Sequence, residues 1–158
     1  NLKTPYIEKS IKESCLIKKN IIQIDEKELN LRKVLNFGHT FAHAYEAALK
    51  YSKKLNHGEA VLLGIMSASK FSFQKKLLNK KEFQLIKNHL IKFKLPRNIN
   101  NRFTKKNLNQ IVSFMKKDKK NNNQKINLVL LKKIGNPNFN LNFQNKELYS
   151  FLKKELTN

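Results

Sequence analysis

Residues 58–71 read GEAVLLGIMSASKF, and no other stretch of the chain constrains the fold as strongly. At 3.6 residues per turn, its apolar side chains fall on nearly every side of a helix. A helix that is apolar all round is buried in the middle of a domain. We therefore predict a central buried helix over residues 57–78.

Shorter helical patterns surround this segment. Apolar residues recur with a period near 3.6 in five further segments, which predicts amphipathic helices. These segments are residues 4–20, 32 or 33 to 50, 80–94, 104–117 and 145–156. Residues 21–32 break the period of the first helix. Thr104 is a suitable N-cap for the helix predicted over residues 104–117.

A small β-hairpin is predicted near the C-terminus. KINLVLLKK at residues 125–133 and FNLNF at residues 139–143 are typical of strands, and Gly135 to Pro137 marks the turn between them. Residues 118–124 form a charged, Asn-rich loop. The chain shows no internal repeat and no clear linker, so residues 1–158 are predicted to form one mainly α, multi-helix domain.

The formal charge of +22 suggests a polyanionic partner. Of the 33 basic residues only Arg32, Arg97 and Arg102 are arginine, whereas surfaces that read nucleic-acid bases favour the guanidinium group. The lysines are scattered along every segment. This pattern indicates a solvated lysine surface in a chain whose overall composition is rich in lysine. We expect no nucleic-acid or membrane partner, and a basic helical module that binds RNA stays as an alternative.

The sequence favours a cytoplasmic protein. It contains no signal-peptide or transit-peptide pattern, and no apolar run approaches the roughly 20 residues that span a bilayer. Cys15 is the only cysteine, and its place in a helical pattern predicts a small buried residue. A reducing compartment is therefore mildly preferred.

Two histidines point to a functional site. His39 and His43 are four residues apart in NFGHTFAHAYE, residues 36–46, so a helix would place them on one face together with Arg32 and Asn36. A buried stripe of this kind would need partners for every polar group. The alternative is a polar stripe that faces solvent, because two histidines at this spacing are a weak metal signature.

His57 stands at the head of the central helix. Gly58, which follows it, would let another backbone or a ligand come close, and Glu59 suits the positive end of the helix dipole. His57 could cap the helix and do nothing more. Three histidines at two adjoining helix ends could instead hold zinc, which usually needs a third or fourth protein ligand. His89 is expected to face solvent.

These residues carry a resemblance that spans nearly the whole chain. The sequence is similar to the C-terminal domain of the 3-dehydroquinate synthase family, within the sugar-phosphate cyclases. The matching positions, in order, are Lys18, Asp25-Glu26-x-Glu28, Arg32-x-x-Leu35-Asn36-Phe37-Gly38-His39-Thr40-x-x-His43-Ala44-x-Glu46, His57-Gly58-Glu59-Ala60-Val61-x-x-Gly64, Met115-x-x-Asp118-Lys119-Lys120, the strand from Ile126 to Leu131, and Ile134-Gly135.

The resemblance implies a role for each site residue. His39 and His57 are two of three protein ligands to a catalytic zinc, with cobalt as an alternative metal. His43 is then an acid/base residue that contacts substrate, and Glu28 is a proton acceptor. The anionic substrate is held by four further residues, Lys18, Arg32, Asn36 and Lys119. Among these, Lys18 and Lys119 each lie beside another lysine, and Glu28 could simply pair with Arg32.

The resemblance also implies a reaction and a missing half. In the family, 3-deoxy-D-arabino-heptulosonate 7-phosphate becomes 3-dehydroquinate with loss of phosphate, in the shikimate pathway, and NAD acts catalytically. This chain contains no Gly-rich phosphate loop, so the NAD-binding domain and the third metal ligand, a glutamate, lie outside it. The chain is then the C-terminal half of a two-domain α/β plus α enzyme, inactive alone and homodimeric when complete.

Some features depart from the family pattern and leave alternatives. Ala42 replaces the usual glycine between the histidines, a change that a helix accepts easily. No aromatic residue directly precedes His57. A different sugar-phosphate cyclase, of the inosose or valiolone type, would share the histidine motif, and a divergent remnant would keep the fold without activity.

Overall fold

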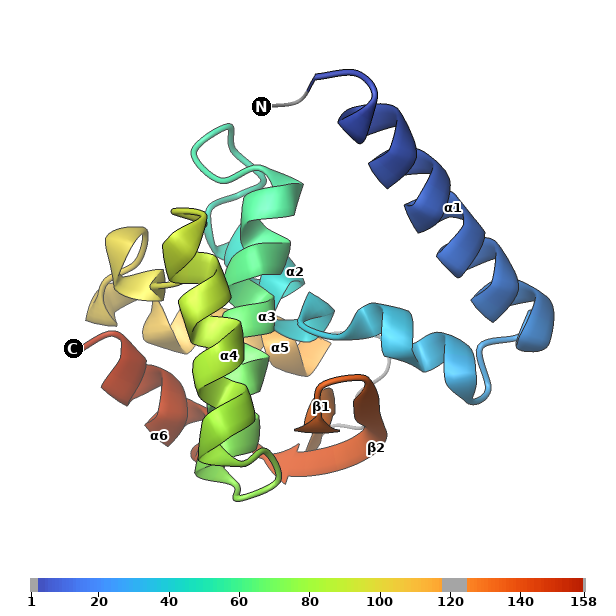
Figure 1. Ribbon diagram of the computed structural model, residues 1–158. Helices are drawn as coiled ribbons and strands as arrows, with labels where there is room; N and C mark the ends of the chain where they lie inside the picture. The colour runs from blue at the N-terminus through green and yellow to red at the C-terminus, as the bar shows by residue number, and fades with distance from the viewer. Residues whose placement is uncertain (1–2, 118–124, 158) are drawn as a thin grey trace. The chain divides into compact units, whose positions relative to one another are not determined.

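Helix α3 (His57–Gln74) is the buried central helix that the sequence predicts. In the computed structural model, which describes residues 3–117 and 125–157, it contacts α2, α4 and β1 (Figure 1). Its fully buried side chains include Leu63, Met66 and Phe71. The chain divides into two units by contacts, Asn1–Asn36 and Phe37–Asn158, and each is described by itself.

The central helix ends earlier than predicted. Lys75 is its C-cap, and the left-handed backbone of Lys76, with φ of 58°, turns the chain away. Asn79 then begins α4 (Lys80–Lys92) by accepting a hydrogen bond from the Glu82 N–H at 2.9 Å. A cap of this kind satisfies a free N–H at the helix start, which is why the helical pattern of residues 57–94 splits here.

The single helix predicted over residues 32 or 33 to 50 is wrong. The structure has a 3-10 helix η1 (Leu31–Asn36), a left-handed Gly38 with φ of 81°, and then α2 (His39–Ala48). Glycine is the residue that adopts this backbone conformation without strain. Arg32 and Asn36 therefore do not share a helical face with His39 and His43.

A contact between two glycines sets how closely α2 and α3 approach. A Cβ atom added to Gly64 would lie 2.2 Å from the Gly38 carbonyl oxygen, and one added to Gly38 would lie 2.6 Å from the backbone nitrogen of Ile65. The close approach expected at Gly58 is absent within the described residues, where a Cβ would meet only the Asn56 side chain at 3.6 Å. The close backbone contact thus occurs at Gly64, six residues further along α3 than Gly58.

The remaining helices and the hairpin complete the second unit. After α4, the chain forms the 3-10 helices η2 (Ile99–Asn101) and η3 (Lys105–Asn107), and then α5 (Leu108–Lys117). Thr104 directly precedes η3, and its backbone N–H donates to Asn107 Oδ1 at 2.9 Å. The predicted start of this helical segment is therefore confirmed, with a first turn that is 3-10 rather than α.

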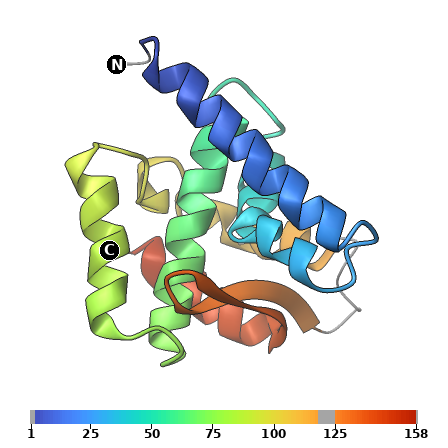
Figure 2. The same ribbon diagram turned by 45° about the vertical axis from the view of Figure 1, so that its right-hand side comes forward.

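The predicted hairpin is confirmed. Strand β1 (Lys125–Lys133) pairs antiparallel with β2 (Asn136–Gln144), and α6 (Asn145–Glu155) follows (Figure 2). The second strand begins three residues earlier than predicted because Pro137 lies within the pairing, opposite Leu131. The predicted loop over residues 118–124 lies outside the described residues.

Aromatic side chains fill the core between α2, α3, α5, α6 and the hairpin. Phe41, Tyr45 and Phe71 are almost completely buried. The Tyr45 hydroxyl lies 2.8 Å from Ser67 Oγ, and burial raises the pKa of Tyr45. Ser72 Oγ accepts a hydrogen bond from the Leu131 N–H at 3.0 Å, which joins α3 to β1. The fold is thus mainly α with a small hairpin, as predicted.

The first unit consists of α1 (Tyr6–Ile24), a loop and η1. No residue of α1 is buried, so the prediction of a buried Cys15 is wrong. A helix buries its apolar stripe only against a second layer of structure, and this short unit contains too little chain to form one.

Asp25 organises the loop after α1. Its carboxylate accepts hydrogen bonds from the backbone N–H groups of Leu29, Asn30 and Arg32 at 2.9, 2.7 and 3.0 Å. Glu28, inside this loop, has a left-handed φ of 56°. The single carboxylate thus holds the backbone on both sides of a conformation that a non-glycine residue rarely adopts.

We predict that Gly64→Ala destabilises the chain, because the new methyl group would collide with backbone rather than with a movable side chain. Overpacking of this kind costs about 1–3 kcal/mol or more. Gly58→Ala is the matched control in the same helix, where space is available and alanine is favoured over glycine by up to about 1 kcal/mol. Urea unfolding followed by circular dichroism measures both, and equal effects of the two substitutions would contradict the glycine contact.

A second prediction concerns the Asp25 carboxylate. Desolvation raises its pKa, but the hydrogen bonds from Asn30, Arg32 and Leu29 outweigh this, so the pKa falls below its ordinary value of 3.8. The loop is therefore stabilised above pH 3.8 and loses this stabilisation as the pH falls through the lowered pKa.

Proton NMR of the chain tests the prediction. The amide resonances of Leu29, Asn30 and Arg32 should move together during acidification, with one midpoint below pH 3.8. Asp25→Asn should abolish this shared titration. A midpoint at or above the ordinary value would show that the three hydrogen bonds do not stabilise the ionised carboxylate.

Candidate metal centre and substrate site

Three imidazoles meet where α2 approaches the start of α3. The ring centre of His39 lies 5.6 Å from that of His43 and 5.9 Å from that of His57. The remaining pair, His43 and His57, is 6.4 Å apart. The helical spacing places the first two on one face of α2, and the packing of α3 brings the third beside them.

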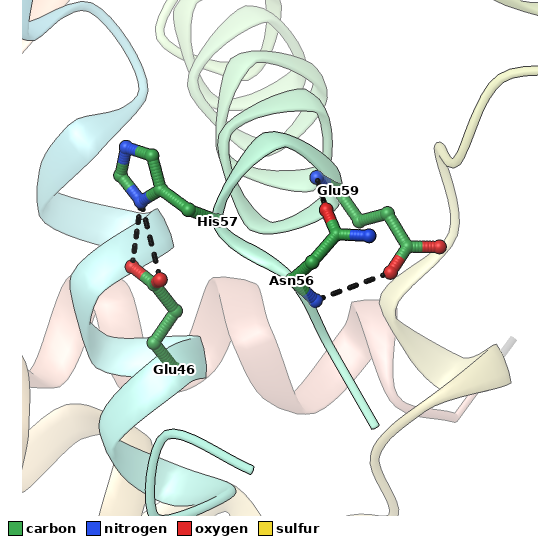
Figure 3. A network of polar contacts seen from close by, with 4 residues as sticks. All are labelled: Glu46, Asn56, His57 and Glu59. Atoms are coloured by element: carbon green, nitrogen blue, oxygen red, sulfur yellow. Dashed lines mark hydrogen bonds and ion pairs between the residues drawn. The ribbon is translucent and has the colours of Figure 1, made fainter. Parts of the chain in front are cut away.

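Hydrogen bonds orient two of the three rings. His39 Nδ1 lies 3.4 Å from the Phe37 carbonyl oxygen, and His57 Nδ1 lies 3.1 and 3.2 Å from the two carboxylate oxygens of Glu46 (Figure 3). A carbonyl or an ionised carboxylate can only accept a hydrogen bond, so Nδ1 carries the proton in both imidazoles. The lone pair of each neutral ring is then on Nε2.

This arrangement suits a pair of metal ligands. Histidines that bind metal donate their second ring N–H to a carbonyl or carboxylate, which fixes the tautomer. Two imidazoles on one tetrahedral zinc ion have ring centres about 5 Å apart. His39 lies at a similar separation from both His43 and His57, so the hydrogen bond at Nδ1, and not the spacing, distinguishes His57. The donor types and spacing thus fit a shared ion.

The environment of His39 favours the uncharged imidazole that a metal requires. Burial lowers the pKa of His39 below its ordinary value of 6.5. The hydrogen bond to Phe37 raises the pKa in part, while the positive charges that His43 and His57 can carry lower it further. A ligand histidine must lose its proton to bind metal, so this shift supports binding.

His43 differs from the other two histidines. It is exposed, and neither of its ring nitrogens has a hydrogen-bond partner among residues 3–117 and 125–157. None of the described residues therefore holds its ring in one tautomer. Such a side chain can turn toward a bound ligand and exchange a proton with it.

The described residues contain no complete set of metal ligands. Within residues 3–117 and 125–157, no group of three or more His, Cys, Asp or Glu residues is arranged to hold an ion. The prediction that a third ligand lies outside this chain stays a prediction.

The start of α3 is capped without His57. Asn56 Oδ1 accepts a hydrogen bond from the Glu59 N–H at 2.9 Å, and Glu59 Oε2 accepts one from the Asn56 N–H at 3.2 Å (Figure 3). Arg102 reaches the other oxygen of Glu59 at 3.2 Å. The alternative that His57 merely caps the helix is therefore wrong, and its imidazole is available for another role.

Three predicted substrate-site residues lie together in the first unit. Glu28 Oε1 accepts a hydrogen bond from Asn36 Nδ2 at 2.7 Å. The Arg32 guanidinium donates to the Glu26 carbonyl, and its backbone N–H donates to Asp25. The loop that Asp25 organises thus carries Glu28 and leads directly into the helix with Arg32 and Asn36.

The other sequence predictions have separate outcomes. Lys18 is exposed on α1, and Lys119 lies outside the described residues. His89 is exposed on α4, as predicted, with its ring centre 4.8 Å from that of Phe93. Within the part of the chain that the structure describes, no helix combines the length and the apolar character needed to cross a bilayer.

Sequence reasoning missed the roles of Asp25 and Glu46. The only local signal for Glu46 is its spacing of seven residues from His39, which continues the stripe on α2. Its partner, His57, is eleven residues further on and lies on another helix. A spacing rule within one helix cannot reveal such a contact.

Known proteins resemble this chain in sequence. A profile of the 3-dehydroquinate synthase C-terminal family matches residues 1–121. The 3-dehydroquinate synthase of Pelagibacter ubique (strain HTCC1062) is 62% identical over 156 residues, which are 99% of this chain and 42% of that protein. The 3-dehydroquinate synthase of Leptospira interrogans (serovar copenhageni) is 37% identical over 155 residues, which are 96% of this chain and 39% of that protein.

The fold is also found in a solved structure. The crystal structure of 2-deoxy-scyllo-inosose synthase, complexed with carbaglucose-6-phosphate, NAD+ and Co2+, matches with a TM-score of 0.65 and 19% sequence identity. The match covers 84% of this chain and 37% of that one. The chain thus spans about two fifths of the length of its relatives. Because the profile matches 121 of its 158 residues, the chain belongs to the 3-dehydroquinate synthase C-terminal family.

Proposed function

We propose that this chain supplies the metal-binding and substrate-binding half of a 3-dehydroquinate synthase. The observation that carries the proposal is the pair of imidazoles, His39 and His57, whose Nδ1 atoms are both bound to oxygen acceptors. Family membership and the partial coverage of the relatives support an additional NAD-binding domain. The complete enzyme would be a cytoplasmic homodimer, by analogy with the family.

The proposed reaction converts 3-deoxy-D-arabino-heptulosonate 7-phosphate to 3-dehydroquinate and phosphate. NAD supplies a transient oxidation, which acidifies a C–H bond of the substrate and permits loss of phosphate. Zinc, or cobalt, supplies Lewis-acid polarisation of the oxygen at the oxidised carbon. The protein side chains supply position, charge and proton transfer.

We assign the metal to His39 and His57 and proton transfer to His43 and Glu28. His43 is suited to this role because no hydrogen bond within the described residues fixes its ring. Glu28 is held in place by Asn36 Nδ2, which donates a hydrogen bond to Glu28 Oε1. A carboxylate positioned in this way can act as a general base toward a bound substrate.

Binding of the substrate anions is assigned to Arg32, Asn36, Lys18 and Lys119. The guanidinium of Arg32 can form paired hydrogen bonds with a phosphate or carboxylate group, whereas a lysine acts as a point charge. Arg32 follows directly on the loop that Asp25 holds. Its backbone position is therefore established before any substrate binds.

The alternative is that the complete enzyme is a different sugar-phosphate cyclase, of the inosose or valiolone type. It is considered because 2-deoxy-scyllo-inosose synthase, which has a similar fold, was crystallised with carbaglucose-6-phosphate, NAD+ and Co2+. Assay of the two substrates side by side distinguishes the activities. Turnover of the heptulosonate phosphate alone would support the proposal made here.

The test uses a chimera in which this chain follows the N-terminal part of the Pelagibacter ubique relative that it does not cover. We expect phosphate release that requires NAD and zinc. His39→Ala or His57→Ala should each lower kcat/KM by roughly a hundredfold or more and abolish bound zinc. Zinc content and turnover close to wild type in either variant would remove that residue from the metal site.

His43→Gln separates proton transfer from metal binding. We expect its zinc content to equal that of the unmodified chimera, while kcat falls by roughly 100-fold or more because a general acid/base is lost. Zinc analysis of the purified protein and a phosphate-release assay measure the two effects. Loss of zinc in this variant would instead make His43 a ligand.

A further inference from the structure

Glu46 continues the stripe of functional side chains on α2. His39, His43 and Glu46 are at positions i, i+4 and i+7, which lie on one face of a helix. The carboxylate of Glu46 is directed at the His57 ring, and Figure 3 shows the second ring nitrogen of His57 on the side away from it.

The position of Glu46 is unfavourable for a carboxylate that has no function. Its side chain is only 13% exposed, so much of its hydration is lost. It also lies in the last turn of α2, where the helix dipole repels negative charge. A compensating hydrogen-bond donor is therefore needed, and the His57 imidazole provides one.

An ordinary helix ion pair does not explain Glu46. Lys50 is four residues further on, which is the usual spacing for such a pair. However, α2 ends at Ala48, and Lys50 has a left-handed φ of 54°. The carboxylate of Glu46 instead accepts a hydrogen bond from His57 Nδ1.

His57 needs an external group to orient its ring. Its backbone is fixed by the capping box of Asn56 and Glu59. Its side chain is 61% exposed, so packing does not hold the imidazole in one rotamer. The bond to Glu46 is the interaction that selects both the ring orientation and the protonated nitrogen.

We infer that Glu46 is a positioning residue that prepares His57 for metal binding, an inference that rests on the proposed role of His57 as a ligand. By accepting the Nδ1–H, the carboxylate keeps the lone pair on Nε2 and makes that nitrogen a stronger donor to the metal. Glu46 itself does not touch the metal. Its effect is on the affinity for the ion.

The test measures zinc binding by the chimera in competition with a chromophoric chelator. Glu46→Gln should raise the zinc dissociation constant roughly 10- to 100-fold, the usual effect of losing an outer partner. Glu46→Asp, which keeps the charge on a shorter side chain, should have an intermediate effect. Long-range proton–nitrogen NMR of the metal-free chimera should show His57 protonated on Nδ1, and Glu46→Gln should reduce that tautomer.

Glu59→Gln is the matched control. It removes the same charge from the first turn of α3, two residues from His57, but its side chain faces Asn56 and Arg102 instead of the imidazole. Its zinc affinity should stay within about twofold of wild type, since glutamine also serves in a capping box. An equal loss in both variants would mean a general charge effect and would overturn the positioning role.

The outcomes separate this inference from the proposed function. If the unmodified chimera binds no zinc, the proposed function fails. If it binds zinc and a folded Glu46→Gln variant binds equally well, only the role of Glu46 is overturned. If Glu46→Gln does not fold, Glu46→Asp decides, and an affinity equal to wild type together with a lost Nδ1–H tautomer overturns the inference.

Discussion

The close contact of Gly38 with Gly64 is the constraint on which the rest of the site depends. A Cβ atom added to either glycine would lie within 3 Å of the facing backbone. Only a pair of glycines lets the start of α2 lie this close to α3. Because His39 directly follows Gly38, and His57 begins the helix that contains Gly64, the same contact sets the separation of the two imidazoles. Backbone packing and the spacing of the two imidazoles therefore have one cause.

Orientation of the rings is a separate problem from their proximity. Two imidazoles can lie 5.9 Å apart and still present protonated nitrogens to an ion. In this structure each relevant Nδ1 has an oxygen acceptor, a backbone carbonyl for His39 and a carboxylate for His57. The two acceptors differ because the two rings differ in exposure. The half-buried ring of His39 is held partly by packing, whereas the exposed ring of His57 depends on a charged partner. His43 lacks such an acceptor in the described residues, and in this respect it differs from His39 and His57.

The sequence predicted the elements well and their junctions poorly. The uniform apolar character of residues 58–71 was enough to identify α3, since burial on all sides leaves an unambiguous pattern. The break at Gly38 was not predictable from residues 32–50, because every residue there except the glycine suits a helix and the break arises from contact with Gly64. The prediction for Cys15 failed for a different reason. The helical period of α1 was correct, but a period does not show whether other residues pack against the helix and bury Cys15. At the site, the histidines were identified from residue type and spacing, but their division into ligands and acid/base group came from family resemblance. The acceptors that support this division are contacts across elements.

The distribution of site residues over the chain has a physical consequence. The proposed metal ligands, His39 and His57, belong to the unit Phe37–Asn158, whereas the proposed substrate-site residues Glu28, Arg32 and Asn36 belong to Asn1–Asn36. Only a few residues join η1 to α2, and the joint contains the left-handed Gly38. The contact of Gly38 with Gly64 fixes the direction in which the chain enters α2. Asp25 fixes the backbone on the other side through three hydrogen bonds. Each group of site residues is thus organised locally, by one backbone contact or one carboxylate. The acceptors that orient His39 and His57, which are Phe37 and Glu46, belong to the same unit as the two histidines.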